Sequence, residues 1–144
     1  MILFDVNVLV SAFREDAPDH VAVRKWLVDV VEGESSYGVS ELVLSGFLRI
    51  VTHPRVFDPP APLEPALEYA QAIRSQPNCI VLAPGRRHWN IFVGLCQRAN
   101  ARGNLVPDAY LAALAIESGS QFITNDRDFS RFDGLEWRPP AVRP

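Results

Sequence analysis

The chain opens on the stretch Ile2-Leu3-Phe4-Asp5-Val6-Asn7, in which a short apolar run meets an acid. The run predicts a buried strand that stops at Asp5, and the residues from Asn7 to Phe13 predict a helix. Short apolar strands alternate with helices along the rest of the chain. This alternation predicts an α/β fold, with a short parallel β-sheet flanked by helices on both faces. Ligands of such sheets bind beyond the carboxyl ends of the strands, so the residues that follow each strand are the candidates for function.

The remaining elements are predicted from apolar spacing, capping residues and helix breakers. Further strands are predicted at 35–39, 79–82 and 121–124, and helices at 18–31, 41–52, 63–74, 87–101 and 107–117. The tail after about residue 133 is rich in proline, and we expect its end to be partly flexible. Because no repeat or internal linker is visible, we expect residues 1–144 to form a single domain.

Length and composition limit the class of protein. The 144 residues suffice to bury a core without a disulfide or metal staple. With 2 cysteines and 3 scattered histidines, a disulfide scaffold and a His/Cys zinc cluster are disfavoured. The net charge of −3 argues against coating of nucleic acid by the whole surface, though not against a local basic stripe. Because no signal-peptide core or membrane-spanning run is visible, we expect a cytoplasmic protein without membrane contact.

Polar and acidic residues gather where the first and last predicted strands end and where one helix begins. The set comprises Asp5, Asn7, Asp108, Thr124, Asn125, Asp126 and Asp128. Carboxylates held side by side repel one another, and a hard divalent cation such as Mg²⁺ or Mn²⁺ relieves that repulsion through oxygen ligands. The joint placement therefore favours a metal site at this edge of the sheet.

Each acid also has a structural interpretation that the sequence leaves open. Asp5 lies between a strand and a helix, where an acid commonly caps the helix. Asp108 near a helix start is favourable for the helix dipole. Asp126 and Asp128 are suited to holding a turn through side-chain hydrogen bonds to the backbone.

Three motifs give the chain a resemblance to a known family. They are Asp5-Val6-Asn7-Val8-Leu9, Pro107-Asp108-Ala109 and Thr124-Asn125-Asp126-Arg127-Asp128-Phe129, and the stretch from Phe47 to Phe57 adds to them. With them, nearly the whole chain resembles PIN-domain proteins, specifically VapC-type toxin ribonucleases of type II toxin–antitoxin systems. The resemblance implies a PIN-like fold and Mg²⁺- or Mn²⁺-dependent hydrolysis of RNA phosphodiester bonds.

The resemblance also implies roles and partners. Asp5, Asp108 and Asp126 match the catalytic, metal-binding acids of the family, while Asn7, Thr124 and Asp128 match supporting residues. The implied partners are an RNA such as tRNA or rRNA, a second copy of the toxin and a cognate VapB-type antitoxin. The antitoxin's tail would insert into the acidic groove and inhibit the enzyme.

One position departs from the family pattern. The family usually carries a glutamate about six residues after the serine that follows the second strand, and this position is Gly46 here. The acid nearby is Glu41, and a shift of five residues turns a helical side chain by about 140° and moves it by about 7.5 Å. Glu41 therefore replaces that glutamate only if the local backbone differs, and its alternative role is to complement the helix dipole.

An acidic protein that acts on RNA needs local positive charge. Arg98 and Arg102 are predicted on one face of a helix, and Arg127 lies within the last acidic motif. We expect these residues to contact RNA phosphates, with an ordinary solvated surface as the alternative.

Other functions compete with a ribonuclease. An aspartyl-phosphate enzyme needs a lysine near the phosphate, and the only lysine of the chain, Lys25, lies in the middle of a predicted helix. A catalytically weak or inactive PIN-like module that only binds RNA or protein is favoured by Gly46. A DNA-directed nuclease is not excluded by the sequence.

Overall fold

The computed structural model describes residues 1–140. Its centre is a 5-stranded sheet in the order β3-β2-β1-β4-β5. The strands are β1 (Ile2–Phe4), β2 (Tyr37–Val39), β3 (Cys79–Val81), β4 (Gln121–Ile123) and β5 (Trp137–Arg138). Every neighbouring pair is parallel. The register aligns Phe4 with Ile123, so Asp5 and Thr124 follow their strands at the same edge of the sheet.

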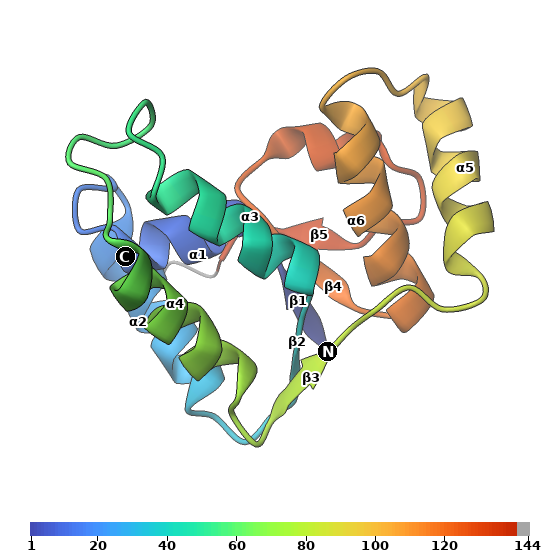
Figure 1. Ribbon diagram of the computed structural model, residues 1–144. Helices are drawn as coiled ribbons and strands as arrows, with labels where there is room; N and C mark the ends of the chain where they lie inside the picture. The colour runs from blue at the N-terminus through green and yellow to red at the C-terminus, as the bar shows by residue number, and fades with distance from the viewer. Residues whose placement is uncertain (141–144) are drawn as a thin grey trace.

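Helices cover both faces of this sheet (Figure 1). Helices α1 (Val6–Phe13), α2 (His20–Val31), α3 (Glu41–Val51) and α4 (Leu63–Arg74) lie on one side, and α5 (His88–Ala99) and α6 (Leu105–Ser118) lie on the other. A short 3-10 helix, η1 (Arg127–Arg131), follows β4. The predicted α/β fold with a parallel sheet between two helical layers is therefore confirmed. Within residues 1–140, no helix has the length and apolar character to cross a membrane.

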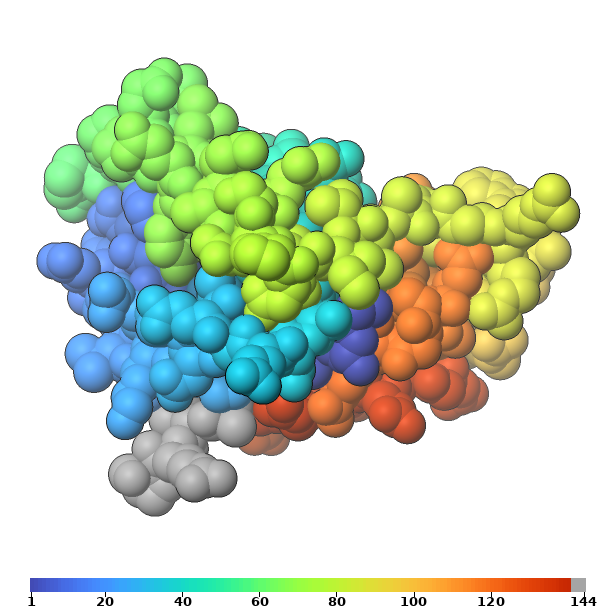
Figure 2. Space-filling view, turned by 90° about the horizontal axis from the view of Figure 1, so that it is seen from below, coloured from blue at the N-terminus to red at the C-terminus, as the bar shows by residue number. Residues whose placement is uncertain are grey.

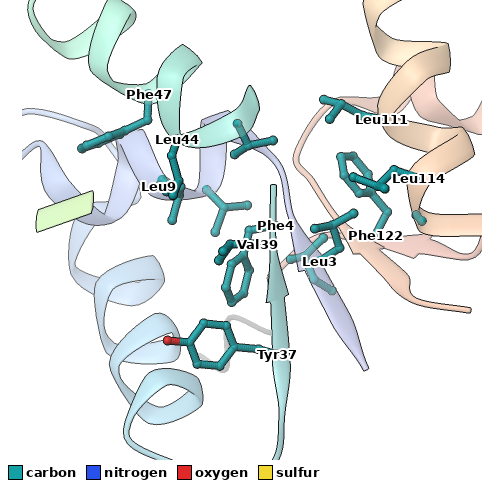
Figure 3. Packing of buried hydrophobic residues seen from close by; sticks show 14 of the residues in the cluster. Leu3, Phe4, Leu9, Tyr37, Val39, Leu44, Phe47, Leu111, Leu114 and Phe122 are labelled. Atoms are coloured by element: carbon teal, nitrogen blue, oxygen red, sulfur yellow. The ribbon is translucent and has the colours of Figure 1, made fainter. Parts of the chain in front are cut away.

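The core explains why the strands are apolar along their whole length. Successive residues of a strand point to opposite faces, and here both faces are covered. Figure 3 shows Leu3 with Phe122 and Leu114 on the side of α6, and Phe4 with Val39 on the side of Leu9 and Leu44. All of these side chains are buried.

Two predicted boundaries differ from the structure in ways that matter for the site. The helix predicted at 87–101 ends at Ala99, because Asn100 adopts a left-handed conformation with φ of 50° that stops the helix. The helix predicted at 107–117 begins two residues earlier, at Leu105. Pro107 is accommodated there because the first backbone N–H groups of a helix need no partner within it.

The tail contains a strand that was not predicted. β5 lies in the proline-rich segment and pairs in parallel with β4, aligning Trp137 with Phe122. Arg138 fixes this segment by donating from Nε to Oε1 of Gln121 at 2.9 Å. The expectation of a flexible end also concerns residues 141–144, which lie outside the described residues.

Candidate active site

Asp5 lies directly beyond β1 and is almost buried, with 7 % of its surface exposed. Its Oδ1 accepts a hydrogen bond from the backbone N–H of Val6 at 2.7 Å, so the side chain caps α1. Its Oδ2 accepts a hydrogen bond from the Thr124 hydroxyl at 2.7 Å. Asp5 is thus held by the start of α1 and by the residue that follows β4, and its capping role accompanies its place in the acidic cluster described below.

Thr124 is the centre of a hydrogen-bond network that joins the ends of β1 and β4. Besides donating to Asp5, its hydroxyl accepts from the backbone N–H of Asp126 at 3.0 Å and from Asn7 Nδ2 at 3.1 Å. Asn7 Nδ2 also approaches Asp5 Oδ2 at 3.3 Å, and Asn7 Oδ1 accepts from the backbone N–H of Asn125 at 3.3 Å. A hydroxyl has one proton and two lone pairs, and all are used here. Thr124 and Asn7 therefore position the carboxylate of Asp5.

Asp126 and Asp128 extend the acidic surface from the end of β4 into η1. Asp126 Oδ1 accepts a hydrogen bond from the backbone N–H of Asp128 at 2.9 Å, which starts η1. This is the turn-forming role that the sequence left open, and it belongs to the side chain of Asp126. Because only one oxygen of Asp126 is used in this bond, the turn and a contribution to a ligand site are compatible.

The electrostatics identify which acids share one space. Burial raises the pKa of Asp5, the hydrogen bonds from Thr124 and Val6 lower it, and the charge of Asp126 raises it further. Burial raises the pKa of Asp108 to about 6, with further contributions from the charges of Asp126, Asp5 and Asp128. We call Asp5, Asp108, Asp126 and Asp128 the acidic cluster. Within it, the charge of Asp126 acts on both Asp5 and Asp108, so these acids lie near one another.

The oxygen atoms of the acidic cluster are of the kind that a hard divalent cation prefers, but their positions do not yet form a coordination site. The ion pairs found among residues 1–140 are Arg14–Asp16 and Arg74–Glu41, so no described cation of the chain neutralises the cluster. Oxygen donors with unbalanced charge are what Mg²⁺ and Mn²⁺ require. In the same range, however, no three His, Cys, Asp or Glu side chains converge closely enough to hold a metal ion. The residues fit such an ion only if the carboxylates move toward one another.

Glu41 is not part of the acidic cluster. Its Oε2 lies 3.0 Å from Nη2 of Arg74 and accepts a hydrogen bond from Nε of the same residue at 3.2 Å. The other candidate on α3, Gly46, faces α1: a Cβ at Gly46 would lie 3.1 Å from Cγ2 of Val6. Helix α3 therefore supplies no carboxylate to the cluster.

The arginines predicted to bind RNA have different positions. Arg98 lies in the last turn of α5, whereas Arg102 lies beyond the end of that helix, so the prediction that both share one helical face is wrong. The reason is the left-handed Asn100 between them. Arg127 begins η1 directly after Asp126 and is exposed.

A pocket beside Thr124 was missed in the sequence. It has a volume of about 480 Å³ and is lined by Thr124 and Asn125, by Arg127 and Ser130 of η1, and by Trp137 of β5. The sequence did not indicate that Trp137 would line a pocket, because only the pairing of β5 with β4 brings this residue of the proline-rich tail beside Thr124.

Comparison with known proteins agrees with the fold and the motifs. The PIN domain family model matches residues 2–135. The chain is 40 % identical over 141 residues to Ribonuclease VapC25 of Mycobacterium tuberculosis, covering 97 % of this chain and 99 % of the relative. It is 39 % identical over 141 residues to Ribonuclease VapC31 of the same species, with 97 % and 99 % covered.

Solved structures share the same fold at low sequence identity. VapBC2 from Rickettsia felis, bound to a DNA fragment from its promoter, superposes with a TM-score of 0.71 at 18 % identity, covering 96 % of this chain and 98 % of that one. Mycobacterium tuberculosis VapC20, a toxin that cleaves the sarcin-ricin loop, gives a TM-score of 0.68 at 17 % identity, with 90 % and 93 % covered. From the family match and the full-length relatives, the chain belongs to the PIN domain family and, within it, to the VapC group.

Proposed function

We propose that this protein is a toxin endoribonuclease that hydrolyses RNA phosphodiester bonds with Mg²⁺ or Mn²⁺. The observation that carries the proposal is the acidic cluster, in which the charges of Asp126, Asp5 and Asp128 act on Asp108 in addition to its burial, and no cation among residues 1–140 pairs with these acids. The names of the relatives, which are ribonucleases at about 40 % identity, support the same activity.

In this proposal, Asp5, Asp108 and Asp126 are the catalytic carboxylates that hold the cation, and Asp128 supports them. When bound there, the cation would neutralise charge at the phosphoryl group and activate the attacking water. The chain's own contribution is to place the carboxylates. Thr124 and Asn7 fix Oδ2 of Asp5, and the backbone N–H of Asp126 is tied to the same hydroxyl. Repulsion within the cluster is relieved on binding, which adds to the affinity for the cation.

The proposed partners follow from charge and exposed apolar surface. Arginines of a VapB-type antitoxin would pair with the acidic cluster and inhibit the enzyme, as charge-assisted hydrogen bonds to carboxylates are strong. The proposal is supported by the family and by the titles of two solved structures of the same fold, VapBC2 and VapBC-1. The RNA, a tRNA or an rRNA, would be met in the cytoplasm, and residues 1–144 would act as one domain.

We also propose a homodimer. A largely apolar groove of about 490 Å³ lies between the start of α3, the end of β3 and helices α5 and α6. Leu42 and Val106 on its wall are 53 % and 37 % exposed, and Ile80 of the edge strand β3 is 44 % exposed. In Figure 2 the segment after β3 crosses the surface toward α5, and Leu82, Ala83 and Pro84 of this segment line the groove. Sedimentation of the purified protein and of Val106→Asp tests the dimer, which the charge should dissociate.

The experiment that tests the activity is cleavage of total cellular RNA by protein freed of antitoxin, with Mg²⁺, with Mn²⁺ or with EDTA. We expect cleavage only with metal, and a loss of roughly a thousandfold or more in Asp5→Asn, which keeps the shape of the side chain. Cleavage in EDTA, or full activity of Asp5→Asn, would overturn the proposed site.

A second candidate function is an RNA- or protein-binding module of weak or no activity. It is favoured by Gly46 and by the spacing of the acids, which do not converge on a common point among residues 1–140. Such a module would retain RNA in a binding assay and leave it intact in every metal condition.

A further inference from the structure

We propose that the pocket between η1 and β5 is a subsite for one unstacked nucleobase of the RNA, next to the phosphate that is cleaved, with Trp137 as its stacking platform. This inference rests on the proposed function, because it assigns a binding place to the nucleotide next to the phosphate that is cleaved at the acidic cluster. It narrows the substrate to single-stranded or looped RNA, since a base in a duplex cannot leave its stack without cost.

The position of the pocket is the first argument. Thr124 is part of the lining of the pocket, and its hydroxyl donates a hydrogen bond to Asp5 at 2.7 Å. Asn125, the next residue, also lines the pocket, and its backbone N–H is bound by Asn7. The wall of the pocket is therefore continuous with the network that fixes the acidic cluster. None of the four acids lines the pocket itself, and in this proposal a strand whose phosphate lies at the cluster places its adjoining nucleotide at the pocket.

The side chains that line the pocket are the second argument. Trp137 is half-buried, and within residues 1–140 it has no aromatic or cationic stacking partner, whereas Trp26 packs edge-on against Phe4 at 5.9 Å and Trp89 packs against Phe92 at 5.4 Å. Trp137 packs against the hydrophobic core, which holds the residue in place. Aromatic side chains that line a groove are the residues on which single-stranded nucleic acids stack their bases.

Polar groups suited to the rest of a nucleotide surround the ring. Arg127 is exposed and forms no ion pair with any described residue, so its guanidinium is available for a phosphate. The side chains of Asn125 and Ser130 are exposed and can donate to the edge of a base. The volume of about 480 Å³ lies within the range of small-ligand pockets.

The test compares Trp137→Ala, Trp137→Phe and Ser130→Leu with the wild type, and uses Trp89→Ala as the matched control. Trp89 is 65 % exposed on α5, away from the lining of the pocket. Ser130→Leu fills the pocket from the exposed surface of η1, so it reports on the pocket even if β5 does not tolerate alanine. Steady-state cleavage of a short single-stranded RNA gives kcat and KM, and end mapping gives the sequence preference at the cut.

We expect Trp137→Ala and Ser130→Leu to raise KM by roughly 5- to 150-fold with little change in kcat, and to weaken the preference for the base beside the cut. Trp137→Phe retains a ring and should keep most of the affinity, and Trp89→Ala should match the wild type. Unchanged KM and preference in both pocket variants, in a protein that cleaves RNA, would overturn the subsite while the nuclease stands.

A binding measurement tests the subsite independently of whether the protein cleaves RNA. The probe is a short single-stranded RNA with one 2-aminopurine, whose fluorescence is quenched when it stacks, mixed with Asp5→Asn protein. Quenching that is lost in the Asp5→Asn, Trp137→Ala double variant supports the subsite even if the wild type cleaves nothing. Equal quenching in both proteins would overturn it.

Discussion

Helices α3 and α6 each carry an acid in the first turn, and both begin on the side of the sheet where the strands end. In α3 the acid is Glu41, which is exposed and paired with Arg74 of α4 at 3.0 Å. In α6 it is Asp108, which has no described cationic partner and whose pKa is raised to about 6 by burial and by Asp126, Asp5 and Asp128. The helix dipole favours both acids equally. What separates them is the neighbour: a cation neutralises Glu41, whereas other carboxylates surround Asp108 and leave negative charge for a ligand to balance.

The strongest way to break this comparison is to remove each charge in turn. Asp108→Asn should reduce metal-dependent RNA cleavage by roughly 100-fold or more, since it removes a carboxylate of the acidic cluster. Glu41→Gln should change cleavage by no more than about twofold, because surface charges outside the site contribute little. Cleavage rates at saturating Mg²⁺, with melting temperatures to confirm folding, check both. A comparable loss in Glu41→Gln would mean that α3 contributes to catalysis after all.

Asp108 and Glu41 differ also in how much of their surroundings could be predicted from the sequence. Asp5, Asp108 and Asp126 could be assigned to one edge because apolar runs mark where short parallel strands end and where α6 begins. The partner of Glu41 could not be predicted, because Arg74 lies 33 residues away and meets it only through the packing of α4 on α3.

The pocket could not be predicted for a related reason. β5 has two residues, too few to show alternation, and it exists because Trp137 and Arg138 pair with β4. The tail has no apolar periodicity that would predict a strand, and β5 forms only because it pairs with β4. The same limit explains Arg102, since a single left-handed residue, Asn100, ended a helix whose apolar spacing continued.

A second prediction concerns the hydrogen-bond network around the Thr124 hydroxyl, which positions Asp5 and has no counterpart around Glu41. Thr124→Val keeps the volume of this fully buried side chain but removes the donor to Asp5 and the acceptor of the Asp126 N–H. Cleavage should fall roughly 10- to 100-fold, as for other residues that orient ligands of a metal. Thr124→Ser, which retains the hydroxyl, should remain within a few-fold of the wild type. Equal losses in the two variants would point to packing rather than to the hydrogen bonds.

A third prediction uses pH to detect the burial of Asp108 and the charges around it, which together raise its pKa. Its pKa of about 6 in the folded protein exceeds its ordinary value of 3.8, so the folded state binds the proton more tightly than the unfolded state. That contribution to stability is present below the ordinary pKa and is lost as the pH rises through about 6. Because Asp108 is half-buried and screened by solvent, Asp108→Asn should recover on the order of 1 kcal/mol above that pH. Urea unfolding in EDTA at about pH 4 and about pH 7 measures it. Identical pH slopes in the wild type and the variant would contradict the shift, and Glu41→Gln serves as the control.

The smallest expected effect is the coupling between Glu41 and Arg74, the pair that removes Glu41 from the cluster. Their side chains are 66 % and 39 % exposed, so water screens the attraction and both side chains lose freedom in forming it. A double-mutant cycle with Glu41→Ala and Arg74→Ala should give a coupling of about 0.5 kcal/mol, which decreases with added salt. Cleavage should be unaffected in all three variants, because neither charge faces the acidic cluster. If Arg74→Ala instead alters the Mg²⁺ dependence of cleavage, a Glu41 released from its partner reaches the cation, and the two ends of the sheet edge form one site.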